Sequence, residues 1–477
     1  MDAKEFREQA HRMVDWMADY FEQAEELPVK PTVKPGDILK QLPASPPEES
    51  ENYDAIFSDF RKIVMPGMTH WESPMFMGYF PANKSYPSVL AEMLTATLGA
   101  QCMSWVTSPA ATELEERMME WLRELCGLPP SFTGVIQDTA STATLCALLM
   151  AREQATGFGV NEDGPEAFPP LTVYGSSETH SSIEKGVKIA GYGRSNLRKV
   201  PVDETWAMDP QALEKAIRSD LEAGYKPACV VATLGTTGST AIDPLGAIAD
   251  ICSRYDIFLH VDAAYAGTAL LLPEKRAMAE GMERADAYVF NPHKWMFTNF
   301  DCSAFYVRDE ELLVRTFEIL PEYLKSSEGD RVTNYRDWGI QLGRRFRALK
   351  LWFVIRSFGA EGLRDILRGH LRMAGWLEKQ VQASEDFEML APVPLNALCL
   401  RFHPPHIDDE EKLDELNRNL LEAVQRSGEL FITHTTLDNR LALRVVCGNT
   451  RLEQRHVEIA WRVLRQTAQS QIGGNTP

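Results

Sequence analysis

A chain of 477 residues, 44% hydrophobic and 25% charged, has the composition of a folded globular protein and is long enough for two or three packed regions. Its net charge of −19 argues against nucleic acid and against an anionic membrane surface as partners, but not against a zwitterionic small molecule. The sequence contains no run of about 18 apolar residues, and its start lacks the pattern of a secretory signal. The eight cysteines are dispersed, without C-x-x-C or zinc-like spacing, so we expect reduced thiols, no metal site and a cytoplasmic location.

The first part of the chain predicts a helical arm. Residues 4–24 place Phe6, Met13 and Met17 on one face of a helix. The proline-rich stretch 28–47 cannot continue that helix and predicts an extended connector. Such a helix has no local surface to pack on, so we expect the arm, residues 1–85, to dock on the body or on a second subunit.

Residues 86–360 form the predicted large domain, in which apolar strand-like runs alternate with helical patterns. This alternation predicts a mostly parallel sheet with helices on both faces, where ligands bind beyond the carboxyl ends of the strands. We expect strands at 134–137, 171–174, 229–233, 257–261 and 287–290, and helices at 143–153 and 210–223 among others. Residues 361–477 predict a smaller α+β domain, with strands at 398–402 and 441–446 and a last helix at 453–467.

The segment Asn291-Pro292-His293-Lys294-Trp295 directly follows the strand expected at 287–290. A lysine in a loop is usually a solvated surface charge. Beside histidine, tryptophan and proline at a strand end, Lys294 becomes a candidate for a covalent bond to an aldehyde cofactor, which requires a neutral amine.

A second candidate, Asp262, ends the apolar run Phe258–Val261. An unpaired buried carboxylate costs several kcal/mol, so Asp262 needs a partner. The protonated ring nitrogen of a cofactor would supply one; capping a helix is the alternative.

Small polar loops follow two further strands. Thr139-Ala140-Ser141 comes between a strand and an apolar helix, where backbone amides and hydroxyls would hold a phosphate, or the residues would simply cap the helix. A similar loop contains Thr237. His180 follows a third strand and either stacks on a flat ring or is a core histidine.

Taken together and in this order, these elements resemble the group II pyridoxal-5′-phosphate (PLP)-dependent decarboxylases, specifically the aromatic-L-amino-acid decarboxylases. The resemblance covers nearly the whole chain. It includes Tyr79-Phe80-Pro81, Ser104-Trp105, Glu113-Leu114-Glu115, Val261-Asp262-Ala263-Ala264-Tyr265, Asn291-Pro292-His293-Lys294-Trp295, Phe300-Asp301-Cys302-Ser303 and Leu342-Gly343-Arg344-Arg345-Phe346-Arg347. It implies the α/β architecture of PLP fold type I (aspartate-aminotransferase-like), with a mostly parallel central sheet, an N-terminal helical arm and a smaller C-terminal α+β domain.

The resemblance also implies roles for individual residues. Lys294 binds PLP covalently, Asp262 pairs with the ring nitrogen, and His180 stacks on one face of the ring, with Ala264 under the other. Thr237 lies near the ring, and the phosphate ligands are Thr139, Ala140, Ser141, Asn291 and His293. The substrate pocket, shared across a homodimer, contains Trp71, Tyr79, Phe80, Pro81, Met103 and Gly343.

Residues 320–330 match the mobile loop of the family, and their polar, glycine-containing composition favours a flexible lid. The resemblance gives Tyr323 the task of returning a proton to the substrate α-carbon. Phenylalanine at this position accompanies aldehyde synthases, so Tyr323 favours decarboxylation. Gly343 leaves room for an aromatic side chain, whereas serine there is associated with histidine decarboxylases.

We therefore expect conversion of aromatic L-amino acids to arylalkylamines and CO2, with the preferred amino acid left open. The alternatives are an aromatic aldehyde synthase, a decarboxylase of histidine or an acidic amino acid, and a catalytically silent dimeric scaffold. Gly191-Tyr192-Gly193 is too short for a nicotinamide-binding motif. The pair His403 and His406 encloses two prolines and indicates a surface turn, not a metal site.

Overall fold

The computed structural model describes residues 1–319 and 331–473, with side chains described up to residue 471. The chain divides into two compact units. The first contains residues 1–81, 376–390 and 400–477, and the second contains residues 82–375 and 391–399.

This division differs from the expected ranges 1–85, 86–360 and 361–477 in two ways. The N-terminal segment belongs to the same unit as the C-terminal segments, and helix α12 (Arg347–Gln382) continues past residue 360. Gly359, with φ +67°, interrupts α12 without ending it.

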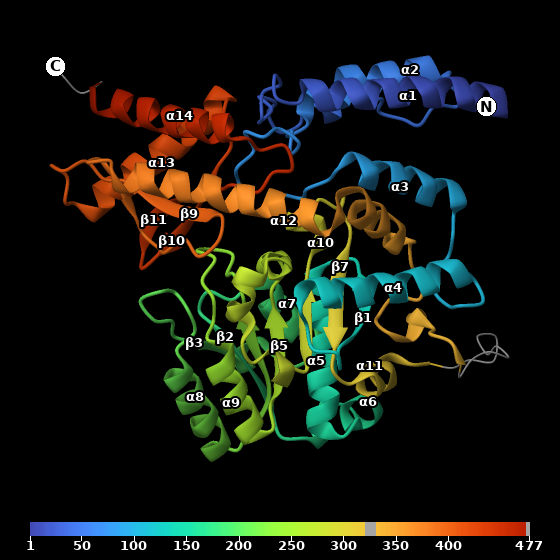
Figure 1. The fold of residues 1–477 in the computed structure, drawn as a ribbon, viewed down its shortest axis with the longest axis vertical. Coiled ribbons are helices and arrows are strands. Elements are labelled where there is room, and N and C mark those ends of the chain that lie inside the picture. Colours follow the sequence, from blue (N-terminus) through green and yellow to red (C-terminus); the bar gives the residue numbers. More distant parts are fainter. Residues whose placement is uncertain (320–330, 474–477) are drawn as a thin grey trace. The chain divides into compact units, whose positions relative to one another are not determined.

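The second unit is built on a seven-stranded sheet (Figure 1). Its order is β1 (Thr133–Gln137), β7 (Ser303–Val307), β6 (Ala287–Phe290), β5 (Phe258–Asp262), β4 (Lys226–Thr233), β2 (Leu171–Ser176) and β3 (Leu197–Val200). The predicted mostly parallel sheet is confirmed, and each of the five strands expected in this domain is present.

Strand direction brings five strand ends to one edge of this sheet. Strands β2 to β6 run parallel, whereas β7 is antiparallel to both β6 and β1. Two antiparallel steps restore the original direction, so β1 runs parallel to β6. The carboxyl ends of β1, β2, β4, β5 and β6 therefore share one edge.

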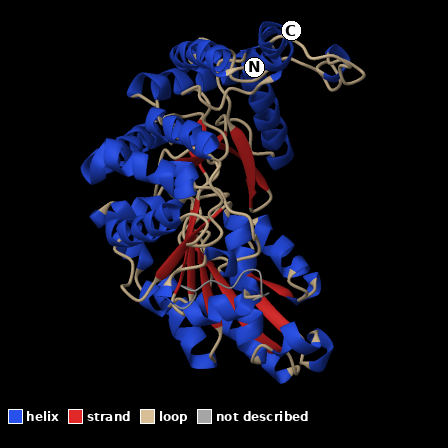
Figure 2. Ribbon diagram, turned by 90° about the vertical axis from the view of Figure 1, so that its right-hand side faces the viewer, coloured by secondary structure: helices blue, strands red, loops and turns tan. Residues whose placement is uncertain are grey.

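Helices cover both faces of this sheet (Figure 2). They include α4 (Pro109–Cys126), α5 (Ala140–Thr156), α7 (Ser181–Ile189), α8 (Pro210–Glu222), α9 (Leu245–Tyr255) and α11 (Glu310–Phe317), with α3 (Tyr86–Leu98) in the same unit. Helix α5 begins at the cap residue Thr139 and ends at Gly157 in the left-handed region. Its apolar side chains join those of Val135, Val173 and Val231 in the core, which fixes its N-terminus beside the end of β1.

The first unit combines helices α1 (Ala3–Gln23), α2 (Tyr53–Asp59), α13 (Glu410–Ser427) and α14 (Gln454–Gly473) with a four-stranded sheet. The sheet order is β10 (Thr433–Leu437), β11 (Arg440–Val446), β9 (Ala397–Phe402) and β8 (Phe387–Met389).

The N-terminal segment lies against this sheet, because Phe76 forms a bridge with Phe431, just before β10, and the Val446 N–H of β11 donates to the Met77 carbonyl at 2.9 Å. The Met77 N–H donates to the Phe431 carbonyl at 2.8 Å. Within the described parts of the chain, no helix combines the length and apolar character needed to cross a membrane.

Candidate active site

The shared edge of the large sheet collects most of the polar side chains expected to bind a cofactor. Thr139, Ala140 and Ser141 follow β1, and His180 follows β2. Thr237 follows β4, while Asp262 ends β5 and Lys294 follows β6. All of these residues belong to the second unit.

Asp262 is buried, with 4% of its surface exposed, at the end of β5. Its Oδ1 accepts a hydrogen bond from the Ala264 N–H at 3.0 Å, and its carbonyl accepts one from Leu234 at 2.9 Å. These bonds fix the carboxylate between the loops that follow β4 and β5. A carboxylate held this way can pair with a cationic nitrogen at the sheet edge.

Lys294 lies half-buried in the short helix α10 (Pro292–Trp295). The next residue, Trp295, is fully buried, stacks on Tyr265 with ring centroids 5.1 Å apart, and donates a hydrogen bond to His370 at 2.9 Å. Asn83 Nδ2 donates to the Lys294 carbonyl at 2.7 Å. The backbone of the lysine is therefore held from three distant segments of the chain.

The sequence did not predict these supporting residues. Asn83 lies 211 positions from Lys294, and His370 lies 75 positions from Trp295. The closeness of Asn83 to the matched segment Tyr79-Phe80-Pro81 was the one signal that could have drawn attention to it.

His180 caps α7, and its Nδ1 accepts the Ser182 N–H at 3.1 Å. Partial burial of the ring lowers its pKa, the Lys294 charge lowers it further, and the Asp262 carboxylate opposes the change. His180 is therefore neutral at pH 7. Because their charges act on this ring, Asp262 and Lys294 lie near it.

The expected phosphate ligands follow β1 and β6, whose carboxyl ends share one edge of the sheet. Thr139 caps the 17-residue helix α5, so the first amides of that helix lack partners within it. The Nδ1 of buried His293 accepts the Cys302 N–H at 2.9 Å. Burial lowers the pKa of His293 to about 3, so the ring is neutral and its proton resides on Nε2, a donor. Asn291 accepts from the Ser303 hydroxyl through Oδ1 at 2.7 Å, which leaves its amide nitrogen to donate.

The residues expected around the substrate form two groups, one in each unit. Met103 and Gly343 belong to the second unit. A Cβ at Gly343 would lie 3.3 Å from Gln101 Nε2, so Gln101 packs closely against this glycine. Its neighbour Arg344 is fixed by a buried ion pair with Glu115 at 2.6 Å.

In the first unit, aromatic rings of the N-terminal segment stack on one another. The ring centroids of Trp71 and Phe76 lie 4.3 Å apart, and those of Trp71 and Tyr79 lie 5.8 Å apart. The Arg444 guanidinium lies 4.3 Å from the Phe80 centroid and donates to the Tyr79 carbonyl at 2.8 Å. Pro81 is buried beside them in the chain. Tyr323 lies outside the described residues.

The donors at the sheet edge fit PLP by their chemistry. A buried carboxylate suits a pyridinium nitrogen, a helix N-terminus with a neutral histidine donor suits a phosphate, and a lysine suits an aldehyde. Ala264 is half-buried and follows Asp262 at the end of β5. The role of each residue expected to bind the cofactor stays a prediction.

The fold is that of the PLP-dependent enzymes of fold type I. Residues 35–403 match the conserved domain of pyridoxal-dependent decarboxylases, and the chain belongs to that family. It is 42% identical to phenylacetaldehyde synthase of Arabidopsis thaliana over 478 residues, which cover 98% of this chain and 96% of that protein.

Two crystal structures are similar over almost the entire length of both chains. Oryza sativa TDC with PLP and tryptamine matches with a TM-score of 0.96 and 37% identity, covering 99% of each chain. Catharanthus roseus tryptophan decarboxylase in complex with L-tryptophan matches with a TM-score of 0.92 and 38% identity, covering 98% of this chain and 99% of the other. The protein is a PLP-dependent decarboxylase.

Proposed function

We propose that this enzyme removes the α-carboxylate of aromatic L-amino acids and releases arylalkylamines and CO2. The observation that carries the proposal is the convergence of Lys294, Asp262 and His180 at one sheet edge in a member of the pyridoxal-dependent decarboxylase family. The aromatic substrate class is supported by the tryptophan decarboxylase that is similar over nearly the whole chain and binds L-tryptophan.

Each of the residues at the sheet edge has a separate proposed role in the reaction. Lys294 Nζ would hold the cofactor covalently, and Asp262 would keep the proton on the ring nitrogen. When bound, PLP would supply an electron-withdrawing ring that accepts the electron pair left as CO2 departs. His180 would pack against the ring, and neutral His293 would donate to the phosphate through Nε2.

Substrate recognition is proposed for the aromatic residues of the first unit together with Met103 and Gly343. Trp71, Tyr79, Phe80 and Pro81 offer flat apolar surfaces to an aromatic ring. Gly343 belongs to this set because a side chain there would press on Gln101, whose Nε2 would lie 3.3 Å from an added Cβ.

The second candidate function is oxidative conversion of an aromatic amino acid to an aldehyde. It is favoured by the 42% identity to phenylacetaldehyde synthase. Tyr323 favours decarboxylation, since we propose that its hydroxyl returns a proton to the substrate α-carbon. Without that proton, oxidation by O2 would compete, releasing aldehyde, ammonia and peroxide.

Mass spectrometry of the products tests both functions. PLP-loaded enzyme is incubated separately with DOPA, tyrosine, phenylalanine, tryptophan, histidine and glutamate. We expect arylalkylamine from one or more of the aromatic substrates; aldehyde as the main product would transfer the enzyme to the oxidative class. Absence of product from every aromatic substrate, with PLP bound, would contradict the proposed substrate class.

The Tyr323→Phe variant tests the proton donor. We expect the product to shift from amine to aldehyde, ammonia and peroxide, because the replacement keeps the ring and removes the hydroxyl proton. An unchanged amine yield would remove Tyr323 from the mechanism.

We also propose a cytoplasmic homodimer with shared active sites. Support comes from apolar side chains that the single chain leaves exposed. On α3 they recur at helical spacing as Tyr86, Leu90, Leu94 and Leu98, with 46–63% of their surface exposed. Phe6 and Val14 of α1 are also exposed, so part of the apolar face of this predicted arm is not covered within its own unit.

Light scattering tests the assembly. We expect twice the chain mass of 53.7 kDa for the natural sequence, and a monomer with reduced activity for Leu90→Glu combined with Leu94→Glu. A natural chain that is monomeric at micromolar concentration and fully active would contradict a shared site.

A further inference from the structure

Lys294 lies in the one-turn helix α10, and the last carbonyls of so short a helix have no partner within it. The Lys294 carbonyl accepts a hydrogen bond from Asn83 Nδ2 at 2.7 Å. Asn83 is 3% exposed, so water has little access to this bond. A buried side chain 211 positions away in the sequence therefore holds the backbone of the lysine.

A second bond of the same kind lies three residues further along the chain, at Phe297. This residue is fully buried and has a φ of +54°, in the left-handed region that a residue with a side chain seldom adopts. Its carbonyl accepts a hydrogen bond from Ser85 Oγ at 2.8 Å. Such a backbone conformation persists only where the surrounding structure holds it. Ser85 therefore supports the turn that leads out of α10.

The segment that supplies both donors is fixed at the start of α3. The Ser85 N–H donates to Ser88 Oγ at 3.1 Å, and the Ser88 hydroxyl donates to the Ser85 carbonyl at 2.8 Å. Ser88 Oγ also accepts the Asn299 N–H at 3.3 Å. Both serines are buried, and all of these residues belong to the second unit. Residues 83–88 therefore contact the stretch 294–299 at three points.

We propose that Asn83 and Ser85 are positioning residues for Lys294. They hold the backbone from Lys294 to Phe297, so that the lysine Nζ keeps one position at the sheet edge. A displacement of about 1 Å in an active site can lower the rate by about 10²-fold, even when its cause lies away from the reacting atoms. This inference rests on the proposed role of Lys294 as the residue that binds the cofactor.

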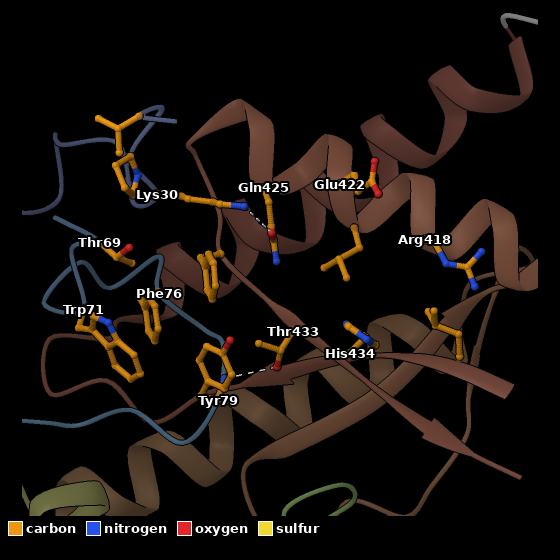
Figure 3. Close-up of a pocket in the computed structure, with 15 residues that line it drawn as sticks. Lys30, Thr69, Trp71, Phe76, Tyr79, Arg418, Glu422, Gln425, Thr433 and His434 are labelled. Carbon is orange, nitrogen blue, oxygen red and sulfur yellow. Dashed lines mark hydrogen bonds between the residues drawn. The ribbon is translucent and has the colours of Figure 1, made fainter. Parts of the chain in front are cut away.

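Tyr79, which is proposed to contact the substrate, has a separate support. It belongs to the first unit, where its N–H donates to Thr433 Oγ1 at 3.4 Å, the dashed line beside Tyr79 in Figure 3. Its carbonyl accepts from Arg444 at 2.8 Å. Neither bond involves Asn83 or Ser85. Replacing those two residues should therefore disturb the lysine more than the substrate rings, so kcat should fall while KM changes little.

Steady-state kinetics and the reaction of bound PLP with hydroxylamine test the proposal on the PLP-loaded full-length enzyme. Hydroxylamine attacks the bond between lysine and PLP, and loss of the visible absorbance of the bound cofactor gives the rate. The variants are Asn83→Ala and Ser85→Ala. Asn196→Ala is the matched control, because Asn196 Nδ2 also donates to a backbone carbonyl at 2.7 Å, that of Tyr192, in the same unit.

We expect Asn83→Ala to lower kcat about tenfold or more, with KM changed by less than about threefold, because a buried carbonyl loses its donor. The hydroxylamine rate should rise, since a loosely held lysine exposes its bond to PLP. Ser85→Ala should change kcat and the hydroxylamine rate in the same directions to a smaller degree. Asn196→Ala should change neither, although it also loses a bond between a side chain and the backbone.

Unchanged kcat or an unchanged hydroxylamine rate in Asn83→Ala would overturn the proposal, and so would changes of equal size in Asn196→Ala. If Asn83→Ala does not fold, Ser85→Ala decides in the same way. Failure of the proposed function gives a different result. If the natural enzyme turns over no aromatic amino acid, the hydroxylamine rates still report the positioning of Lys294. If Lys294→Ala retains the visible absorbance of bound PLP, the proposed role of Lys294 is itself wrong.

Discussion

The two units hold their functional side chains in opposite ways. At the edge of the large sheet, Asp262 and His293 are 4% and 3% exposed, and each accepts a backbone hydrogen bond. In the first unit, the rings of Trp71 and Tyr79 are exposed and stack on other aromatic rings of the same unit. Burial fixes protonation state and geometry, as the catalysis of bond cleavage requires, whereas exposed rings leave a surface for recognition.

Ion pairs follow the same contrast. Arg344 and Glu115 form a buried pair beside the end of β1, with side chains 6% and 2% exposed. Arg12 and Asp54 form a pair in the first unit whose side chains are 51% and 69% exposed. Breaking the buried ion pair should therefore lower stability much more than breaking the exposed ion pair.

The largest expected effect is that of Lys294→Ala. Turnover should fall by about 10³-fold or more, because the variant removes the amine that we propose binds the cofactor covalently. Amine production and the visible absorbance of bound PLP both report the change. Lys215→Ala on exposed α8 is the control and should retain both. Normal turnover by the Lys294→Ala variant would contradict the proposal that Lys294 binds the cofactor.

A second prediction compares the ion pairs directly. Arg344→Met leaves the Glu115 carboxylate buried without its partner and should lower the free energy of unfolding by about 3–5 kcal/mol. Arg12→Met should lower it by less than about 1 kcal/mol, because water screens the exposed pair. Urea denaturation monitored by tryptophan fluorescence measures both. Equal effects would show that burial does not distinguish the two units.

A third prediction concerns the loss of folding stability at acid pH. Burial lowers the pKa of His260, within β5, to about 4, compared with roughly 6.5 in an unfolded chain. Between these values the unfolded state binds a proton that the folded state does not, so stability falls as the pH drops from about 6.5 to 4. The slope contributed by one such histidine is at most about 1.4 kcal/mol per pH unit.

Urea midpoints at pH 7, 6 and 5 test this behaviour in the natural protein and in His260→Gln. The variant should lose less stability on acidification. Some slope should remain, since His293 titrates in the same direction. Parallel curves for the two proteins would rule out His260 as a source of acid sensitivity.

The smallest expected effect lies in the first unit. Thr433→Val removes the acceptor of the Tyr79 N–H, a long bond at a partly exposed site, and should lower stability by less than about 1 kcal/mol. Thr435→Val on the same strand is the control. Thermal unfolding compares the two, and a loss of several kcal/mol would mean that the Tyr79 backbone is held far more rigidly than its surroundings indicate.

Local pattern in the sequence determined the strands of the large sheet and the residues that follow them. Apolar runs ending in Asp262, or leading into Lys294 and Thr139, are signals within a few neighbouring residues. Strand β3, four residues long and largely half-exposed, and the antiparallel strand β7 were not identified.

Tertiary structure alone decided how these residues are supported. The bond from Asn83 to the Lys294 carbonyl, the contact of Trp295 with His370 and the pairing of Arg344 with Glu115 all join segments at least 75 residues apart. The same holds for the N-terminal segment, which the sequence predicted as an arm. Its Phe76 pairs with Phe431, just before β10, and its Tyr79 contacts Thr433 of β10. Hydrogen bonds and ring contacts between distant segments leave no local periodicity, because their partners meet only after the chain has folded.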